Sequence, residues 1–291
     1  MTYNVTLFGL KFNINPVAFT LPIKDGWDIY WYGIIIAAGF LSALIYAMRT
    51  TKRYGINNDR LLDVVLVTTP VAIICARLYY VLFDGVKAES IWDVIGISGN
   101  SGLAGIAIYG GVIGAFGCGA LMCKLRKINL LDTFDLAATG LLLAQGIGRW
   151  GNFFNQEAYG TFTGSSWFGM QSNRTVSELG EGLVHPCFLY ESIWCILGFI
   201  LLNHIGKNRK FKGQLVLTYG IWYGLERGFL ELIRTDSLMI GNFRVSSLLS
   251  FILCIGCSIA MFVILKKKKE EATESTYEDL FGENETEKAE E

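Results

Sequence analysis

Long apolar segments recur along the chain and are separated by shorter polar ones. Each segment is close to the roughly 20 residues with which an α-helix crosses a hydrocarbon core about 30 Å thick. The segments cover residues 29–48, 61–83, 103–122, 130–148, 186–205, 213–233 and 245–265. The pattern predicts an all-α polytopic membrane protein with seven transmembrane helices.

Basic residues gather in every second connection between these predicted spans. Residues 49–60, 123–129 and 206–212 each hold three or four lysines and arginines, and residues 266–269 are all lysine. Lysine and arginine accumulate in the cytoplasmic loops of membrane proteins. We therefore expect the N-terminus outside and the C-terminus in the cytoplasm.

The predicted spans divide the chain into three parts. Residues 1–28 are expected to form an outer N-terminal segment, residues 29–265 the membrane domain and residues 266–291 a cytoplasmic tail. The outer loop 149–184 is long enough for a small extracytoplasmic head. Its glycine, serine and aromatic residues at 164–169 suit contact with lipid headgroups, and an ordinary mobile loop fits them equally well.

Composition supports a membrane protein and sets the tail apart. Hydrophobic residues make up 52% of the chain and charged residues 18%, against about 25% charged in soluble domains. Residues 270–291 hold ten acidic residues and one lysine, so the basic-then-acidic tail is predicted to be disordered. The first basic residue is Lys11, and the first apolar span is too long for a signal peptide, so none is expected.

Ionisable side chains within or beside the spans lie toward their outer ends. They are Arg77, Arg149, Glu157, His185, Glu191, Glu226, Arg227, Glu231 and Arg234. Such groups are costly in lipid and mark functional sites. Their position at one leaflet favours a site open to lipid headgroups over the midplane site of a transporter. An anionic-lipid binding or transport protein and a different lipid transferase remain alternatives.

The sixth span carries a charged face. Arg227, Glu231 and Arg234 are spaced i, i+4, i+7, so they lie on one side of a helix. Glu231 could hold an arginine in a fixed pose and leave other donors free for a phosphate. The alternative is a buried ion-pair ladder that only packs helices.

Residues 148–157 form the most informative run, Gly-Arg-Trp-Gly-Asn-Phe-Phe-Asn-Gln-Glu. Arg149 and Asn152 are one helical turn apart, and the glycines permit close approach of a ligand. An arginine beside amide donors predicts a pocket for a phosphodiester. Trp150 and Phe153 could equally be interfacial membrane anchors.

Two shorter motifs outside this run also predict local structure. His185-Pro186 is expected to begin a helix, with the proline in the first turn and His185 acting either in the site or as a simple cap. Gly110 and Gly114 predict close helix packing in the third span. The phenol of Tyr109 needs a polar partner there.

Several common catalytic motifs do not occur in the sequence. There is no phosphate-binding P-loop, zinc-protease motif, nucleophile elbow or cysteine–histidine zinc spacing. Cys254 and Cys257 form a C-x-x-C without ligand partners nearby, so neither a metal nor a redox role is expected. An enzyme of this kind would receive its nucleophile and leaving group with its substrates.

The run 148–157 resembles the signature of the bacterial prolipoprotein diacylglyceryl transferases. The resemblance continues in chain order from the first to the sixth span and leaves out the acidic tail. The shorter matches are Trp31-Tyr32-Gly33, Ala76-Arg77-Leu78, Gly110-Gly111-Val112-Ile113-Gly114, His185-Pro186 with Tyr190-Glu191, and Arg227 with Glu231 and Arg234.

This resemblance implies an enzyme that transfers the diacylglyceryl group of phosphatidylglycerol to the lipobox cysteine thiol of a prolipoprotein. A thioether forms and glycerol 1-phosphate is released, the first step of lipoprotein maturation. The implied partners are phosphatidylglycerol, prolipoprotein signal peptides with a lipobox cysteine and the bilayer, without nucleic acid, cofactor or metal. The implied location is the bacterial plasma (inner) membrane, spanned several times, with the active site toward the outer face.

The resemblance also implies the site residues. Arg149, Arg227, Tyr109 and Glu231 would be catalytic, and Tyr32, Arg77, Asn152, Asn155, Glu157, His185 and Arg234 would bind substrate.

One position departs from the family pattern, because many members carry histidine where this chain has Tyr109. A phenol with a pKa of about 10 is no proton acceptor for a thiol with a pKa of about 8.5. An obligatory histidine base is therefore excluded here, and a different proton route is expected. Glu157 or Glu231 could accept the proton, although orienting an arginine suits them better, so the acceptor stays open.

Overall fold

Two compact units make up the chain in the computed structural model, which describes residues 3–22, 26–83, 107–235, 239–240 and 243–287. The first unit comprises residues 1–44 and 138–291, and the second comprises residues 45–137. The predicted outer segment 84–102 lies outside the described residues, as does the start of the third predicted span.

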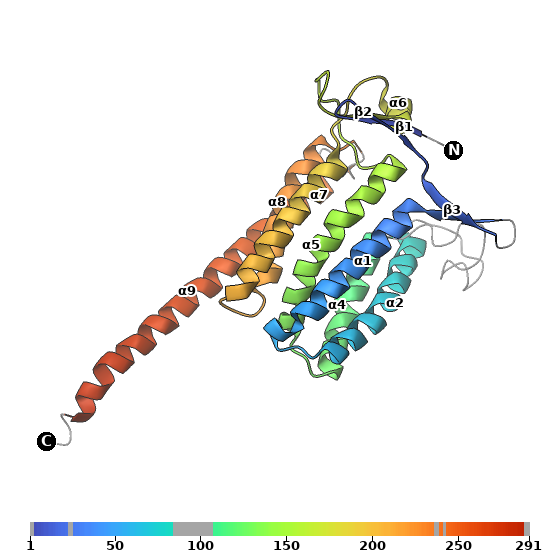
Figure 1. The fold of residues 1–291 in the computed structure, drawn as a ribbon. Helices are drawn as coiled ribbons and strands as arrows, with labels where there is room; N and C mark the ends of the chain where they lie inside the picture. The colour runs from blue at the N-terminus through green and yellow to red at the C-terminus, as the bar shows by residue number, and fades with distance from the viewer. Residues whose placement is uncertain (1–2, 23–25, 84–106, 236–238, 241–242, 288–291) are drawn as a thin grey trace. The chain divides into compact units, whose positions relative to one another are not determined.

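Each of the seven predicted spans coincides with a helix over most of its described residues (Figure 1), although residues 29 and 30 of the first span belong to a strand. The helices are α1 (Trp31–Thr50), α2 (Asn58–Phe83), α4 (Ile108–Leu125), α5 (Leu130–Asn155), α7 (Cys187–Ile205), α8 (Gln214–Ile233) and α9 (Val245–Glu287). Short 3₁₀ turns, η1 (Thr51–Tyr54) and η2 (Gly206–Asn208), follow α1 and α7.

Within the described residues, six helices are long and apolar enough to cross a membrane. Of the seven helices named above, α8 is not among these six. Its twenty residues include three charged ones, Glu226, Arg227 and Glu231. The chain is therefore a predominantly helical, polytopic membrane protein.

Small residues bring α1, α5 and α7 of the first unit together. A Cβ added to Gly39 of α1 would lie 2.8 Å from the carbonyl oxygen of Ala144 in α5. The Ser192 hydroxyl of α7 donates a hydrogen bond of 2.7 Å to the carbonyl of Gly146 in α5. Close backbone approach of this kind stabilises helix pairs where lipid supplies no hydrophobic drive.

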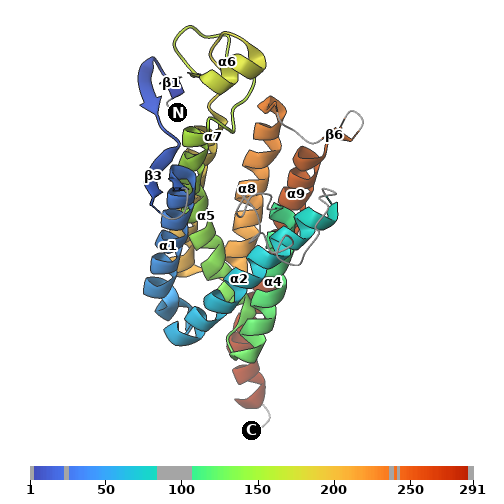
Figure 2. The ribbon, with the colours of Figure 1, turned by 90° about the vertical axis from the view of Figure 1, so that its right-hand side faces the viewer.

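A tryptophan pair joins α7 to α8, and close glycine contacts join α8 to α9. Trp194 and Trp222 stack, and each indole donates a 3.0 Å hydrogen bond to the carbonyl of the other residue. Gly224 of α8 faces the backbone of Ser250 in α9, and the two helices run side by side (Figure 2). These contacts hold α7 against α8 and α8 against α9.

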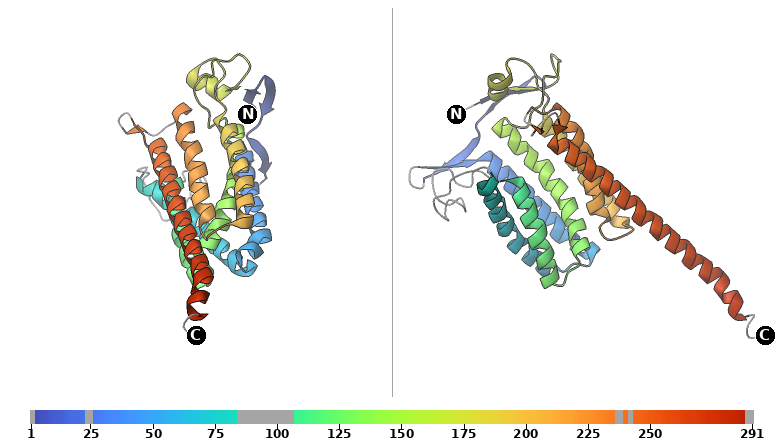
Figure 3. Two further views of the ribbon diagram at one scale, coloured as in Figure 1. Left: turned by 90° about the vertical axis from the view of Figure 1, so that its left-hand side faces the viewer. Right: turned by 180° about the vertical axis from the view of Figure 1, so that it is seen from behind.

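The second unit is built on the pair α2 and α4, which pack along each other (Figure 3). Gly110 of α4 lies directly against the backbone of Cys75, and Gly114 lies against the side chain of the same residue. The close packing predicted for these two glycines is confirmed.

Short strands form the part of the first unit beyond the helix ends. β1 (Tyr3–Leu7) pairs with β2 (Leu10–Ile14) and with β5 (Met170–Ser172), and β3 (Val17–Leu21) pairs with β4 (Trp27–Tyr30), all antiparallel. A further hairpin joins β6 (Met239–Ile240) and β7 (Phe243–Arg244). The expectation of an all-α fold is wrong for these segments, because strands of five residues or fewer give no apolar run of membrane length.

A small hydrophobic core ties these strands to the helix ends. Val5 and Leu7 of β1 pack with Phe153 of α5 and Phe188 of α7. Phe153 is buried rather than lipid-facing, so it is not an interfacial anchor. Beside this core, α6 (Asn173–Leu179) begins with a capping box between Ser172 and Thr175.

The last helix extends beyond the predicted span. The sequence predicts a disordered tail from residue 266, whereas α9 continues as a helix through Glu287. Lys266–Glu270 and Lys267–Glu271 form i,i+4 pairs at 3.7 and 3.8 Å, a spacing that favours helix. These charged pairs account for helix at the start of the tail.

Replacing Gly110 by alanine should destabilise the protein, whereas the same change at Gly117 on the same helix should not. An added Cβ at Gly110 meets backbone that cannot move aside, but at Gly117 it meets nothing within 4 Å. Overpacking typically costs about 1–3 kcal/mol. Thermal unfolding in detergent should show a lower Tm for Gly110→Ala alone, and equal Tm values would contradict the packing.

Candidate active site

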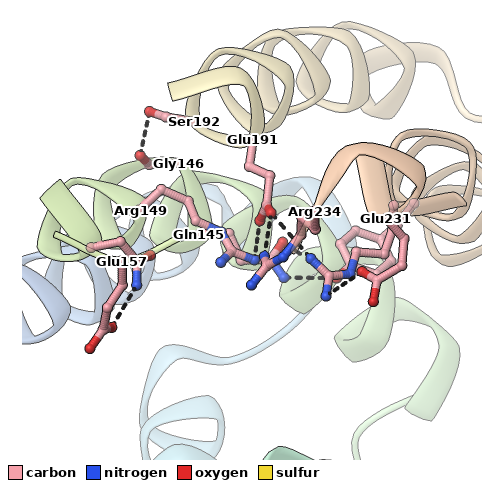
Figure 4. Close-up of polar contacts among 11 residues, drawn as sticks. Gln145, Gly146, Arg149, Glu157, Glu191, Ser192, Glu231 and Arg234 are labelled. Carbon is pink, nitrogen blue, oxygen red and sulfur yellow. Dashed lines mark hydrogen bonds and ion pairs between the residues drawn. The ribbon is translucent and has the colours of Figure 1, made fainter. Parts of the chain in front are cut away.

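One buried carboxylate lies at the centre of an arginine cluster where the C-terminal parts of α5 and α8 meet the N-terminal part of α7 (Figure 4). Glu191 of α7 is fully buried and forms an ion pair with Arg149 of α5. It also contacts Arg227 of α8 at 3.2 Å and Arg234, which follows α8, at 3.1 Å. Side chains far apart in the sequence are thus fixed around a single group.

A second carboxylate holds Arg227 from its own helix. Glu231 lies one turn along α8 and contacts the Arg227 guanidinium at 2.9 Å. The main-chain carbonyl of Glu231 accepts a hydrogen bond from Arg244. The predicted i,i+4 pairing of Arg227 with Glu231 is confirmed.

The ion-paired groups of this cluster carry unequal charge. Three guanidiniums, those of Arg149, Arg227 and Arg234, face the two carboxylates of Glu191 and Glu231. One positive charge is left over among these ion-paired groups, and a third carboxyl, that of Glu226, also interacts with the three arginines. Converging guanidiniums are a donor arrangement that suits an oxyanion such as a phosphodiester.

Loop backbone fixes the position of Arg234. The amide of Gly160 donates to the carbonyl of His185 at 2.9 Å, and the amide of Thr161 donates to the carbonyl of Ile233 at 2.8 Å. The loop segment of Gly160 and Thr161 therefore runs between the start of α7 and the end of α8. A Cβ at Gly160 would lie 2.7 Å from the Ile233 carbonyl oxygen, so this position requires glycine.

The end of α5 turns Glu157 away from the helix axis. Gln156 has a positive φ of 55°, a left-handed conformation that ends helices and is unusual without glycine. The amide of Glu157 donates to the carbonyl of Asn152 at 2.9 Å. The side-chain amide of Asn152 lies 3.4 Å from the Glu157 carboxylate, so this predicted pair is together.

A second polar network surrounds Glu157. Arg174 of α6 contacts Glu157 at 3.3 Å and Glu178 at 2.8 Å, and Tyr159 donates a hydrogen bond to Glu178. The hydrogen bond to Glu178 raises the pKa of the Arg174 guanidinium above its usual value, so this side chain stays cationic.

Two adjoining pockets share Glu157 and Arg174. The larger, about 460 Å³, is also lined by Asn155, Tyr30 and Phe154, and the smaller, about 250 Å³, by Glu178 and Thr235. Both pockets lie next to the end of α5, in the first unit.

Two further predicted residues lie near the ends of the helices in the first unit. Tyr32 of α1 packs against Gly151 of α5 and interacts electrostatically with Glu157 and Arg149. His185 lies 3.2 Å from the hydroxyl of Tyr190. Pro186, not His185, is the N-cap residue of α7, so the alternative that His185 caps the helix is wrong.

Arg77 and Tyr109 belong to the second unit. Arg77 in α2 is buried and lies over the ring of Tyr80 at 5.4 Å. Tyr109 in α4 is 47% exposed, with its ring 6.4 Å from that of Tyr79. Their assignment to the site stays a prediction.

Sequence reasoning missed two features of this site. Glu191 was grouped with the charged residues but not assigned to the site, although it contacts all three arginines. Arg174 was not predicted to belong to the site. Its i,i+4 spacing to Glu178 could have predicted their ion pair. Its contact with Glu157 depends on the fold of the head and has no local signal.

Fold and site together define a polytopic membrane protein with an arginine cluster around a buried carboxylate near the ends of its helices. Comparison with known proteins narrows this class. A family model described as prolipoprotein diacylglyceryl transferase matches residues 16–264. The chain belongs to the prolipoprotein diacylglyceryl transferase family, as the sequence motifs predicted, and is an enzyme.

Several relatives carry the name phosphatidylglycerol–prolipoprotein diacylglyceryl transferase. The protein from Clostridioides difficile (strain 630) is 41% identical over 263 residues, covering 90% of this chain and 100% of the relative. The protein from Limosilactobacillus reuteri (strain DSM 20016) is 39% identical and covers 88% and 93%. The protein from Bacillus velezensis (strain DSM 23117 / BGSC 10A6 / LMG 26770 / FZB42) is 41% identical and covers 85% and 91%.

Glu191→Gln should destabilise the protein strongly, because it leaves three partly buried arginines without their shared, fully buried carboxylate. Removing one partner of a buried ion pair typically costs about 3–5 kcal/mol. Asp63→Asn is the matched control, since Asp63 pairs with Arg126 at an exposed position where such pairs contribute about 0–1 kcal/mol. Thermal unfolding should show a much lower Tm for Glu191→Gln and a nearly unchanged Tm for Asp63→Asn. Similarly small decreases in Tm for both variants would contradict the role of Glu191.

Proposed function

We propose that the chain transfers the diacylglyceryl group of phosphatidylglycerol to the lipobox cysteine of prolipoproteins and releases glycerol 1-phosphate. Membership of the family supports this reaction. The arginine cluster around Glu191 is the observation that carries it, because three converging guanidiniums offer the charge-assisted donors that phosphate oxygens accept.

The reaction replaces a carbon–oxygen bond by a carbon–sulfur bond. The cysteine sulfur attacks the C3 carbon of the diacylglycerol unit, and the phosphate oxygen leaves with the bonding electrons. Arg149 and Arg227 stabilise the charge that develops on the phosphate, as preorganised donors with little access to water. Nearby guanidiniums also favour the reactive thiolate.

Carboxylates and amides of the site have supporting roles in this proposal. Glu231 orients Arg227, and Arg234 completes the cluster. Asn152, Asn155 and Glu157 bind the polar part of a substrate beside the pocket at the end of α5. Tyr32, Arg77 and His185 support binding, and Tyr109 takes the position of the family's frequent histidine.

We further propose seven membrane spans, with α8 as the sixth. Arg227 and Glu231 of α8 are ion-paired inside the helix bundle, which reduces their cost in the membrane. The basic loops then lie in the cytoplasm and the arginine cluster toward the outer face of the plasma membrane. The head of residues 149–184 and the N-terminal strands lie on that outer side.

The direct test is incubation of the purified protein with phosphatidylglycerol and a lipobox peptide. Mass spectrometry should detect a peptide with one added diacylglyceryl thioether, together with glycerol 1-phosphate. A peptide with serine in place of cysteine should give neither product. Lipid binding without any thioether would contradict the transferase and support a lipid-binding protein.

Arg149→Ala and Arg227→Ala should each lower the transfer rate by about 10²–10³-fold, the usual cost of losing one preorganised donor to a developing charge. Both proteins should still insert into the membrane. Arg126→Ala serves as the control, because Arg126 is exposed and pairs only with Asp63 among the contacts described. Near-normal transfer by either site variant would refute its assigned role.

Tyr109→His should retain transfer, because histidine occupies this position in many relatives and the side chain here is half exposed. The assay with lipobox peptide measures it directly. Tyr109→Phe removes the hydroxyl and keeps the ring, so unchanged activity in this variant would show that the hydroxyl has no part in the mechanism. Loss of activity in Tyr109→His would show that this chain has diverged from those relatives.

A further inference from the structure

A third carboxyl group lies beside the arginine cluster without a partner. Glu226 of α8 is only 9% exposed, and within the described part of the chain neither of its side-chain oxygens has a hydrogen-bond partner. Buried polar groups are nearly always hydrogen-bonded, so each exception calls for a physical explanation. One explanation is a partner that arrives with substrate.

The neighbouring carboxylates are already occupied. Glu191 holds three arginines, Glu231 holds Arg227 and Glu157 contacts Arg174. Each of them orients a guanidinium, which makes it poorly suited to take up a proton. Glu226 is the buried carboxyl in this region with both oxygens open as acceptors.

Glu226 directly precedes Arg227 on α8 and lies within electrostatic reach of the arginine cluster. The charged groups that act on its carboxyl are Arg149 of α5, Arg227 and Arg234, and Glu191 of α7.

Groups without formal charge complete these surroundings. Cys195 of α7 and Tyr223 of α8 also interact electrostatically with Glu226. Residues 245–265 of α9 carry no charge, and Cys254 and Cys257 face Gly224 and Gly220. Arg149, Arg227, Arg234 and Glu191 are therefore the charges that bear on Glu226 among these neighbours.

We infer that Glu226 accepts the thiol proton of the incoming cysteine, an inference that rests on the proposed transferase function. The sulfur–hydrogen bond breaks and the proton passes to a carboxylate oxygen of Glu226. The sulfur electron pair forms the bond to C3, and the C3–oxygen electron pair leaves with the phosphate. Afterwards Glu226 returns the proton to water.

Charge balance supports this route. Cleavage of the C3–oxygen bond turns a phosphodiester monoanion into a phosphate monoester dianion and so adds one negative charge. Protonation of Glu226 removes one negative charge in the same step. The arginines around Glu191 therefore face the same total charge before and after transfer, which avoids a costly charge imbalance in a medium of low dielectric constant.

The test compares a cysteine lipobox peptide with its selenocysteine analogue, using the full-length protein and phosphatidylglycerol. A selenol is ionised at neutral pH and needs no base. Glu226→Gln keeps the size of the side chain but removes the acceptor, and Glu226→Asp keeps an acceptor. Glu270→Gln in the exposed tail is the matched control. The selenocysteine-to-cysteine rate ratio is measured within each variant, so the fraction of folded protein cancels.

Glu226→Gln should lower the cysteine rate by about 10²-fold or more, the usual contribution of a general base, and raise the rate ratio by a similar factor. Glu226→Asp should recover part of the cysteine rate, and Arg149→Ala should slow both peptides without raising the ratio. A ratio for Glu226→Gln equal to that of the parent protein would overturn the inference. If the parent protein forms no thioether, the transferase function itself fails.

Discussion

A single buried carboxylate determines the arrangement of this site. Glu191 holds Arg149 from α5, Arg227 from α8 and Arg234 from the segment after α8. Three guanidiniums would repel one another in a medium of low dielectric constant, and the central negative charge offsets that repulsion. In the proposed function, the guanidinium donors that face away from Glu191 bind the lipid phosphate.

The packing of the first unit places this carboxylate where the arginines meet. Glycines at the α1–α5, α5–α7, α7–α8 and α8–α9 contacts let helix backbones approach closely, so small shifts along the helix axes are resisted. Gly160 then brings loop backbone against the ends of α7 and α8. Closely packed helices whose ends are held by loop backbone provide a fixed geometry. A site that stabilises the charge developing in a transition state requires such a geometry.

The sequence predicted the helices well because apolar runs of membrane length are a strong local signal, and six of the spans also satisfy length and hydropathy in the structure. The i,i+4 pair of Arg227 and Glu231 followed from helical spacing alone. The strands of the head were missed because Val5 and Leu7 alternate with half-buried or exposed neighbours. The central role of Glu191 was missed because its three partners come from other elements, and their meeting depends on tertiary packing.

The central claim concerns where the lipid phosphate binds, and an experimental structure with phosphatidylglycerol bound tests it most directly. We predict the phosphate within hydrogen-bonding distance of the guanidiniums of Arg149 and Arg227, on the side not taken by Glu191. A phosphate held instead at Arg174, away from both arginines, would contradict the account.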